Sequence, residues 1–300
     1  MDGLNIFVKV VETGGFSAAA RALGLSKSQV SKQVSRLEDR LGVRLLQRTT
    51  RKMSLTEEGG AFYDRARQIL DDIIDAEDAV THLSATPKGT LRISMPTIFG
   101  NRHLMPLLPE FMKLYPDLKI ETDLNDRVVD VVNDQFDLAV RITVLPDLSL
   151  IAKKLAPVRM VVCASPDYWA KNGTPGTPED LKDHQCLLYT NLTTRNEWHF
   201  HEKGGRHMRI KINGGFRSNN DDSLRAAALA GLGVFYGPAY VLSEDICSNR
   251  LEPVLADYVK QDLNMYIVYP NKQYLSSKVR AFVDFLTEHF GPEPYWNSTT

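Results

Sequence analysis

Residues 18–41 read AAARALGLSKSQVSKQVSRLEDRL, and the spacing of their apolar and capping residues predicts the fold of the amino-terminal part of the chain. Its small and apolar residues predict a short helix that Gly24 ends, with Ser17 as the amino-terminal cap. Ser26 to Gln29 then fits a capping box, in which a serine side chain and the residue three positions later bond each other's backbone amides. Two helices separated by so short a turn indicate a helix-turn-helix.

The second helix of this pair has two unlike faces. Val30, Val34, Leu37 and Leu41 fall within about 60° of one another on a helical wheel and predict its buried stripe. The opposite face carries small donors and cations, which fit a major groove, where glutamine suits adenine and lysine or arginine suits guanine. An ordinary solvated face is the alternative. The predicted DNA-contacting residues of this helix are Ser26, Lys27, Ser28, Gln29, Ser31, Lys32, Ser35 and Arg36.

Shorter elements are predicted on both sides of the helix pair. Residues 5–13 predict a helix that Gly14-Gly15 ends, and the two extended runs of residues 43–55 predict a β-hairpin wing with a basic tip. Cations on a wing can reach phosphates or a narrow minor groove without reading much sequence. The wing residues predicted to contact DNA are Arg48, Arg51 and Lys52.

Charge is distributed unevenly along the chain. Residues 1–60 carry ten Lys/Arg against six Asp/Glu, a net charge of +4, whereas the whole chain has a formal net charge of −1. A basic module on a neutral to acidic body is expected where one end of a protein meets a polyanion. Charge alone leaves a solvated basic surface as the alternative.

A long helix is predicted after Thr56, whose side chain can cap it ahead of the acids Glu57 and Glu58. Its apolar residues recur at intervals of 4, 3, 4, 3, 4 and 3, which is the spacing of a coiled-coil seam. Because the first domain is too small to cover so long a stripe, a second copy of the chain is the expected partner. Such a dimer would address two half-sites of an interrupted inverted repeat. The predicted seam is Phe62, Ala66, Ile69, Ile73, Ala76, Val80 and Leu83.

Strands alternate with helices from residue 89 onward. TLRISM, LKIETDL and FDLAVRI, separated by helices predicted over 101–115 and 127–134, indicate a βαβαβ unit with a parallel sheet. A second cycle runs from VRMVVCA to LGVFYG, with helices predicted near 179–183 and over 222–231. The sequence therefore predicts two α/β lobes.

The final strand and helix return the chain to the first lobe. NMYIVYP predicts the strand, and residues 276–290 predict the helix. Strands that cross between the lobes near Val162 and Ile267 would leave a cleft at the carboxyl ends of the strands, where open sheets bind ligands.

Composition excludes several classes of protein. With 43% hydrophobic and 24% charged residues, the 300-residue chain has the composition of a folded protein of about two domains. It contains no run of 18 apolar residues and no basic region before an apolar one, so neither a membrane span nor a secretory signal is predicted, and a cytoplasmic location is expected. Cys163, Cys186 and Cys247 lack CxxC spacing and are expected to be buried thiols.

Enzymatic chemistry and metal binding find little support in the sequence. His199, His201 and His207 could share a strand face, but Gly204-Gly205 favours a hairpin with polar histidines over a metal site. GxGxxG, GxSxG and Walker motifs are absent, and Asp221-Asp222 are interpreted as acids at a helix start. The protein is therefore predicted not to be an enzyme and to need no cofactor or metal.

The run from Phe7 to Gly59, with the DLAVRI and ALAGLGVFYGP segments, resembles the LysR-type transcriptional regulators, and the resemblance covers about 290 of the 300 residues. It implies DNA contacts by the helix and wing residues named above, dimerisation through the long helix, and tetramers built from two dimers. The implied domains are a winged helix-turn-helix over 1–58, a linker dimerisation helix over 57–86, and a two-lobed α/β effector-binding domain over 89–300. That last domain resembles periplasmic binding proteins, with lobe 1 at about 89–161 and 268–290 and lobe 2 at about 163–266.

The resemblance also places a small-molecule effector in the cleft. Arg102 near helix amino termini would favour a carboxylate or phenolate, and Phe99 and Tyr236 would suit a ring, so an aromatic or amphipathic organic acid is predicted. The alternative is that Arg102 points at solvent. The predicted effector-binding residues are Pro96, Thr97, Ile98, Phe99, Asn101, Arg102, Arg141, Thr143, Thr190, Asn191, Asn219, Asn220 and Tyr236.

The sequence therefore predicts a DNA-binding transcriptional regulator whose operator binding or activation is modulated by a small molecule in the inter-lobe cleft. One alternative is a constitutive DNA-binding repressor or architectural protein with no ligand. Another is an enzyme fused to a DNA-binding domain, for which a catalytic constellation in the cleft would be the sign.

Overall fold

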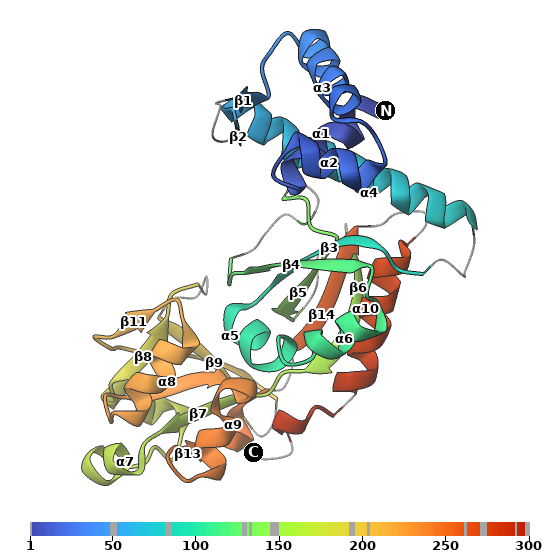
Figure 1. Ribbon diagram of the computed structural model, residues 1–300. Coiled ribbons are helices and arrows are strands. Elements are labelled where there is room, and N and C mark those ends of the chain that lie inside the picture. The colour runs from blue at the N-terminus through green and yellow to red at the C-terminus, as the bar shows by residue number, and fades with distance from the viewer. Residues whose placement is uncertain are drawn as a thin grey trace. The chain divides into compact units, whose positions relative to one another are not determined.

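The computed structural model describes residues 2–48, 53–81, 86–127, 131, 134–144, 150–191, 196–202, 205–260, 263–270, 275–291 and 293–297. The chain folds into two compact units, Met1–Ala85 and Thr86–Thr300, each with its own hydrophobic core (Figure 1). None of the described helices is both long and apolar enough to cross a bilayer.

The amino-terminal unit begins with three helices, α1 (Asp2–Glu12), α2 (Phe16–Leu23) and α3 (Lys27–Leu41). The predicted capping box of α3 is confirmed, because the Gln29 amide donates to Ser26 Oγ at 3.2 Å and the Ser26 amide donates to Gln29 Oε1 at 2.8 Å. The predicted cap of α2 by Ser17 is wrong. That helix already starts at Phe16, and Gly15 occupies the cap position without a side-chain bond.

The buried stripe of α3 is shorter than its periodicity predicts. Val30, Val34 and Leu37 are buried in the core that α3 shares with α1 and α2. Leu41, predicted as the last member, is instead 39% exposed. Gly42 ends the helix in a left-handed conformation with φ 72°, so the chain leaves the core at this point.

A buried carboxylate ties α3 to the segment that follows it. Glu38 is 2% exposed, and its Oε1 accepts hydrogen bonds from the Leu45 amide at 2.9 Å and the Leu46 amide at 3.1 Å. Its Oε2 accepts a bond from Arg44 Nη1 at 3.1 Å. These bonds fix the start of the wing to α3.

The predicted wing is confirmed as an antiparallel pair of short strands, β1 (Leu46–Arg48) and β2 (Met53–Leu55). Gln47 lies opposite Ser54 in the register. The tip of the wing, with Arg51 and Lys52, lies outside the described residues.

The long connecting helix is confirmed as α4 (Glu57–Thr81). Its first turns pack into the core of the amino-terminal unit, where the Phe62 ring lies 5.6 Å from that of Phe7 and Ala66 is buried. The amino-terminal unit therefore covers Phe62 and Ala66, the first two members of the predicted stripe.

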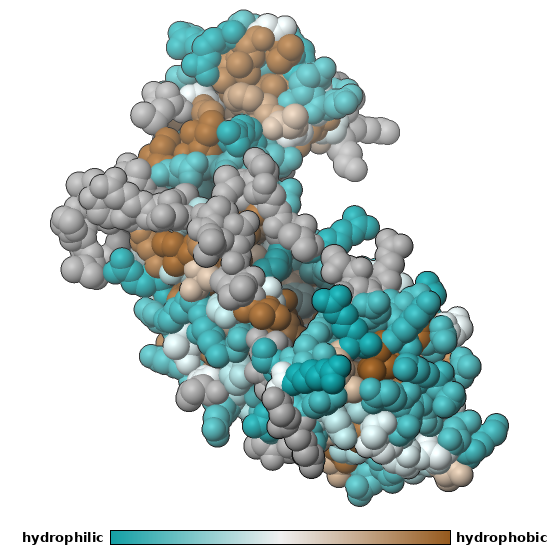
Figure 2. Space-filling view, turned by 180° about the vertical axis from the view of Figure 1, so that it is seen from behind, coloured by the Kyte–Doolittle hydropathy of each residue, from teal (hydrophilic) through white to brown (hydrophobic). Residues whose placement is uncertain are grey.

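The stripe becomes more exposed farther along α4. Ile69 is 42% exposed and Ile73 is half-buried. The side chains of Ala76 and Val80, and the whole of Leu83, lie outside the described part of the chain. On the face drawn in Figure 2, hydrophobic side chains gather between hydrophilic ones in the amino-terminal unit, at the top of the view.

The first sheet of the carboxy-terminal unit has the strand order β4-β3-β5-β14-β6. Its strands are β3 (Gly89–Met95), β4 (Leu118–Leu124), β5 (Leu138–Thr143), β6 (Leu150–Pro157) and β14 (Asn264–Pro270). β3 pairs in parallel with β4 and β5, which confirms the parallel unit predicted from the sequence.

The helices of the first lobe differ in part from the prediction. The helix expected over 101–115 is three pieces, namely α5 (Thr97–Phe99), a π-helical turn (Gly100–Leu104) and α6 (Leu108–Leu114). Most of the helix expected over 127–134 lies outside the described residues. The final helix is confirmed as α10 (Ser277–Phe290).

The second sheet has the order β11-β8-β12-β7-β13. Its strands are β7 (Met160–Ala164), β8 (Cys186–Tyr189), β11 (Arg217–Ser218), β12 (Val234–Pro238) and β13 (Glu252–Val254). Its helices are α7 (Pro166–Asn172), the 3-10 helix η2 (Pro178–Asp183), α8 (Asp221–Leu229), α9 (Ala239–Cys247) and η3 (Ala256–Tyr258). A separate hairpin joins β9 (Glu197–His201) to β10 (His207–Lys211).

The chain passes between the two sheets a few residues away from the predicted positions. Val162 lies inside β7 of the second sheet and Ile267 inside β14 of the first, so neither residue is at a crossing. The first crossing follows Pro157, where β6 ends, and the second precedes Asn264, where β14 begins. Apolar strands continue on both sides of each crossing, so hydrophobicity alone does not mark the change of sheet.

The cysteines and the segment beyond α10 differ in part from the prediction. Cys163 and Cys186 are buried, but Cys247 is exposed at the end of α9. Beyond α10, the 3-10 helix η4 (Tyr295–Asn297) places Trp296 in the core, with its ring 5.4 Å from that of Phe290.

Replacing Glu38 tests the link between α3 and the wing. Glu38→Ala leaves the buried Leu45 and Leu46 amides without this acceptor, and we expect a loss of about 2 to 4 kcal/mol in the stability of the amino-terminal unit. Hydrogen exchange at these two amides measures the effect. Glu38→Gln keeps an acceptor oxygen and should lose less than half as much. Unchanged protection of both amides in Glu38→Ala would contradict the proposed anchor.

Candidate functional site

The solvent-facing side of α3 is the first candidate site. Its first half carries no acid, and Glu38 in its second half is turned into the core. Ser31 and Ser35 lie half-buried at the flanks of this surface. The fully exposed members of the predicted set are Ser26, Lys27, Ser28, Gln29, Lys32 and Arg36.

The cap of α3 limits what Gln29 can offer to a base. Its Oε1 already accepts a hydrogen bond from the Ser26 amide, so while the cap persists only its N–H groups are available outward. A two-bond contact to adenine needs an acceptor as well as a donor. Donation alone fits the acceptors of guanine or thymine. Ser26 Oγ also lies 2.9 Å from Ser28 Oγ, so these two hydroxyls form one small polar group.

The wing supplies the other predicted DNA contacts. Arg48 is the last residue of β1, but its side chain is outside the described part of the structure, as are Arg51 and Lys52. The paired strands lead to the tip that carries these cations.

A cavity of about 280 Å³ in the carboxy-terminal unit is the second candidate site. Four predicted effector-binding residues line it, and they come from both lobes: Pro96, Arg141, Asn191 and Tyr236. Pro96 and Asn191 follow the ends of β3 and β8, as expected for a ligand cleft at the carboxyl ends of strands.

Several other predicted residues are engaged elsewhere in the first lobe. Ile98 and Phe99 are buried in the core, where apolar burial holds α5 to the sheet. The Thr97 amide donates to Asp126 Oδ1 at 3.0 Å, and Asn101 is exposed. Thr143 lies opposite Asn264 in the sheet. None of these side chains lines the cavity.

The predicted residues of the second lobe are divided in the same way. The Thr190 amide donates to the Ser218 carbonyl at 2.9 Å, and Asn219 is exposed. Asn220 caps α8, since its Oδ1 accepts a bond from the Ser223 amide at 3.0 Å. These residues lie near the cavity in sequence but are not part of its lining.

Arg102 does not enter the cavity either. Its guanidinium forms an ion pair with Asp222 and donates to the Val241 carbonyl at 3.2 Å, so it joins the first lobe to α8 and α9 of the second. Neither the predicted ligand contact nor the solvent-facing alternative describes it. Tertiary structure supplies an internal partner 120 residues away in the sequence.

Sequence reasoning missed most of the polar lining of the cavity. The missed polar residues are Asn125, Asp126, Arg127, Tyr189, Asp221 and Tyr240. The rule that ligands meet the carboxyl ends of parallel strands could have found the three that follow β4. Asp221 does start α8 as predicted, but its side chain also lines the cavity. The remaining lining is apolar, formed by Ile142, Val158, Met160, Pro238 and Leu263.

The charges of the cavity are unequally compensated. Arg141 donates to the Val140 carbonyl at 2.7 Å and to Ser94 Oγ at 2.9 Å, and burial lowers its pKa against the opposing effect of Asp123 and Asp126. Burial, together with Asp126 and Asp222, raises the pKa of Asp221 to about 7. Burial and Asp221 also raise the pKa of Tyr189.

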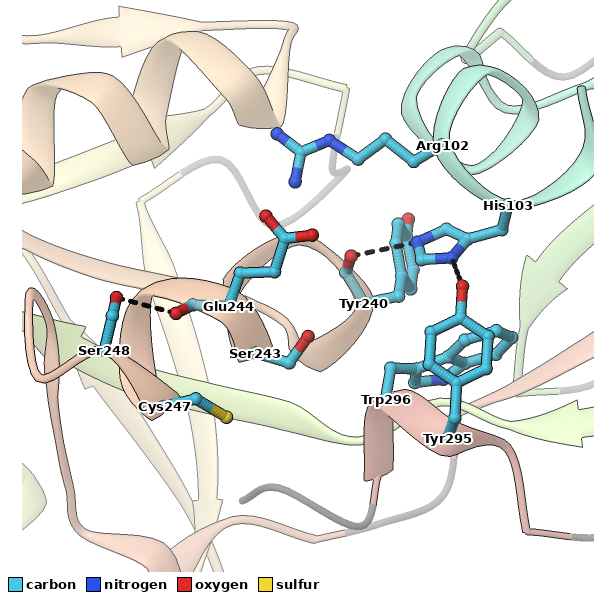
Figure 3. A pocket seen from close by; sticks show the side chains of 9 residues that line it. All are labelled: Arg102, His103, Tyr240, Ser243, Glu244, Cys247, Ser248, Tyr295 and Trp296. Carbon is cyan, nitrogen blue, oxygen red and sulfur yellow. Dashed lines mark hydrogen bonds between the residues drawn. The ribbon is translucent and has the colours of Figure 1, made fainter. Parts of the chain in front are cut away.

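A second, more open groove of about 760 Å³ lies between the π-helical turn and α9 (Figure 3). His103 Nε2 donates to the Tyr240 carbonyl at 3.0 Å, so its Nδ1 accepts the bond from the Tyr295 hydroxyl, and burial lowers the pKa of the imidazole. Figure 3 shows Arg102 and His103 facing α9 across this groove. His103 of the first lobe therefore contacts both the Tyr240 carbonyl of the second lobe and the Tyr295 side chain near the carboxyl end of the chain.

The histidines of the β9–β10 hairpin lie as a polar cluster. The rings of His199 and His201 are 4.9 and 5.1 Å from that of His207, respectively. Across the described ranges, no three His, Cys, Asp or Glu side chains are arranged to hold a metal ion.

Comparison with known proteins gives a consistent result over most of the chain. The model of the bacterial regulatory helix-turn-helix protein, lysR family, matches residues 1–60, and the LysR substrate binding domain matches residues 84–291. An uncharacterized HTH-type transcriptional regulator of Haemophilus influenzae is 38% identical over 279 residues, which cover 93% of this chain and 96% of that protein. The regulator CrgA of Neisseria meningitidis serogroup C is 36% identical over 292 residues, 96% of each chain.

Solved structures agree with the sequence comparison. CrgA of Neisseria meningitidis, described as a LysR-type transcriptional regulator, has a TM-score of 0.61 and 35% identity, covering 96% of this chain and 98% of that one. The Vibrio cholerae virulence activator AphB has a TM-score of 0.60 and 30% identity with the same coverage. The chain therefore belongs to the LysR family of transcriptional regulators, and it is a DNA-binding regulator with an effector-binding domain.

Proposed function

We propose that α3 enters the major groove of an operator with its exposed face toward the bases. The observation that carries this proposal is the division of the helix between a buried apolar side and an exposed side, whose first half carries cations and small donors without an acid. Base contacts are assigned to Ser28, Gln29, Lys32 and Arg36, with Ser26, Lys27, Ser31 and Ser35 at the edges. Phosphate contacts are assigned to Arg48, Arg51 and Lys52 on the wing.

The second half of the seam on α4 is proposed as the dimer interface. Phe62 and Ala66 are withdrawn from it, because they pack in the core of their own unit. Ile69 and Ile73 begin the part that a second α4 would cover, and Ala76, Val80 and Leu83 continue it in sequence. A dimer of this kind presents two copies of α3 to two half-sites, and two such dimers form the proposed tetramer.

The cavity between the lobes is proposed as the effector site. A ligand that contacts Arg141 of one lobe and Asn191 or Tyr236 of the other would favour one arrangement of the lobes, and it acts only through its different affinity for the two arrangements. The organic acid suggested by Arg102 loses that support, because Arg102 is paired with Asp222 outside the cavity.

A regulator without a ligand is the second candidate function, and one experiment separates the two. Footprinting of the full-length protein on DNA beside its own gene, with and without candidate metabolites, should show a footprint that changes with the effector. Asn191→Ala should abolish the change and keep the ligand-free footprint. A footprint that no metabolite alters favours constitutive binding.

Two substitutions of Gln29 distinguish base reading from helix capping. Gln29→Glu keeps the capping box but replaces the N–H donors by a carboxylate, so we expect wild-type thermal stability and a loss of operator affinity of at least 1 to 3 kcal/mol. Gln29→Ala should lower both. Competition between operator and random DNA measures the specificity. An equal loss on both DNAs for Gln29→Ala would contradict base reading by this residue.

The dimer interface is tested at Ile73. Ile73→Asp would place an unpaired carboxylate in each half of the proposed interface, at a cost of several kcal/mol, and sedimentation should then show smaller assemblies with weaker operator binding. Ala61→Asp introduces the same charge at an exposed position of α4 outside the seam and should change neither property. An Ile73→Asp protein with the wild-type sedimentation would show that α4 does not form the interface.

A further inference from the structure

We propose that the effector cavity selects a small molecule with a protonated amine, whose ammonium group lies between Asp221 and Asp126 beside the Tyr240 hydroxyl. This inference rests on the proposed role of the cavity as the effector site and names the chemical class that its lining fits. It replaces an organic acid by a cation or, where a carboxylate is also present, by a zwitterion.

The first observation is a carboxylate, Asp221, without an internal counter-ion among the described residues. Asp221, at the start of α8, is half-buried and has neither a hydrogen bond nor an ion pair from its carboxylate to any other residue that the structure describes. Asp126 faces it from the segment after β4 and bonds the Thr97 amide. Two carboxylates that share a cavity repel each other, so a cation between them removes both the repulsion and the cost of burial.

The second observation is independent of the acids. The Tyr240 side chain is only 6% exposed, lines the cavity, and makes no hydrogen bond through its hydroxyl within the described ranges. Burial, followed by Asp221, Tyr189 and Asp126, raises the pKa of this phenol. The side chains of these three residues line the same cavity as Tyr240. A hydroxyl that lines a cavity can accept a hydrogen bond from a ligand, and an ammonium group has three donors, enough for two carboxylates and one phenol oxygen.

The positive groups of the cavity act on Asp126 but not on Asp221, because Asp126 opposes the lowering of the Arg141 pKa by burial, whereas no cation is among the causes that shift the pKa of Asp221. Arg141 is directed to the Val140 carbonyl and Ser94 Oγ in the sheet, and Arg127 is exposed. Asp222 on the same helix, Asp126 after β4, and the phenols of Tyr189 and Tyr240 are the titratable groups that face Asp221. All four are negative or neutral.

The remaining lining fits the body of an amine. The rings of Tyr189, Tyr236 and Tyr240 and the apolar side chains of Met160 and Pro238 surround a space of about 280 Å³. Aromatic faces attract cations as well as apolar groups. A single aromatic ring or a short alkyl chain that carries an amine therefore matches the cavity in size and character.

Matched sets of probes test the charge that the cavity selects. Calorimetric titration of the full-length protein would compare tyramine with tyrosol and 4-hydroxyphenylacetate, and pentylamine with pentanol and pentanoate. In at least one set the amine should bind at least tenfold more tightly than its neutral and acidic counterparts. An acid that binds more tightly than its amine, or no amine binding up to 10 mM, would overturn the proposal.

Affinity for the amine should also depend on pH in a defined direction. Because the ammonium group stabilises the ionised form of Asp221, a proton competes with it below a pKa of about 7, and affinity should rise about tenfold from pH 6 to pH 8. Asp221→Asn should remove this rise and lower amine affinity at pH 8 at least tenfold while sparing the alcohol. Asp167→Asn, an exposed acid in the first turn of α7, is the matched control and should change nothing.

Two further measurements keep the outcome unambiguous. Should Asp221→Asn unfold, Asp126→Asn can be used in its place, because it retains an acceptor for the Thr97 amide. This variant should lower the affinity for the amine in the same way. Tyr240→Phe should weaken it several-fold without changing the pH dependence. Amine affinity unchanged in the folded variants contradicts the inference. If an acid instead alters the footprint and needs Asn191, the cavity remains the effector site and only the amine is wrong.

Discussion

Charges buried in a protein interior need partners, and the rigid parts of this structure depend on how those partners are supplied. Asp245 of α9 has no exposed surface and binds Arg225 of α8 and Arg250 beyond its own helix. Lys278 of α10 is buried against Asp137 at 3.1 Å and the Thr90 carbonyl at 3.0 Å. Glu38 is buried in a similar way in the amino-terminal unit, where its carboxylate accepts hydrogen bonds from two backbone amides at the start of the wing. Each contact ties one element of the fold to another segment, and breaking one would leave an uncompensated charge.

Asp221 is an exception among these buried charges, and it lines the cavity that is proposed as the effector site. Its neighbours in the cavity are another carboxylate and two phenols, and burial raises its pKa to about 7. A group that the fold leaves uncompensated can be compensated by a bound molecule. The same burial that makes the rest of the domain stable therefore gives the cavity its selectivity.

The connection between the lobes is built from polar contacts as well as from the shared core. Arg102 reaches Asp222 and the Val241 carbonyl, and His103 binds the Tyr240 carbonyl and the Tyr295 hydroxyl. Tyr240 belongs to both networks, since its backbone accepts the bond from His103 while its side chain lines the cavity. A ligand at the Tyr240 hydroxyl would thus act one residue away from the Val241 carbonyl that Arg102 holds.

The parts of the protein that depend on local spacing follow from the sequence alone. The capping box at Ser26 and Gln29, the buried face of α3 from Val30 to Leu37 and the parallel βαβ pattern follow from intervals of a few residues, and the structure has them where the sequence predicts them. The two-domain reading and the family also follow from these local patterns.

Which side chains share a site depends on how the elements pack in three dimensions. Arg102 and Asp222 are 120 residues apart, and the pairing that removes Arg102 from the cavity cannot be read from either local sequence. Asp221 and Asp222 look alike in the chain, but successive residues in a helix turn point in different directions, and only the packing of two lobes determines which one lines the cavity. Whether a charge is buried depends on what surrounds the residue in three dimensions, and the local sequence does not specify those surroundings.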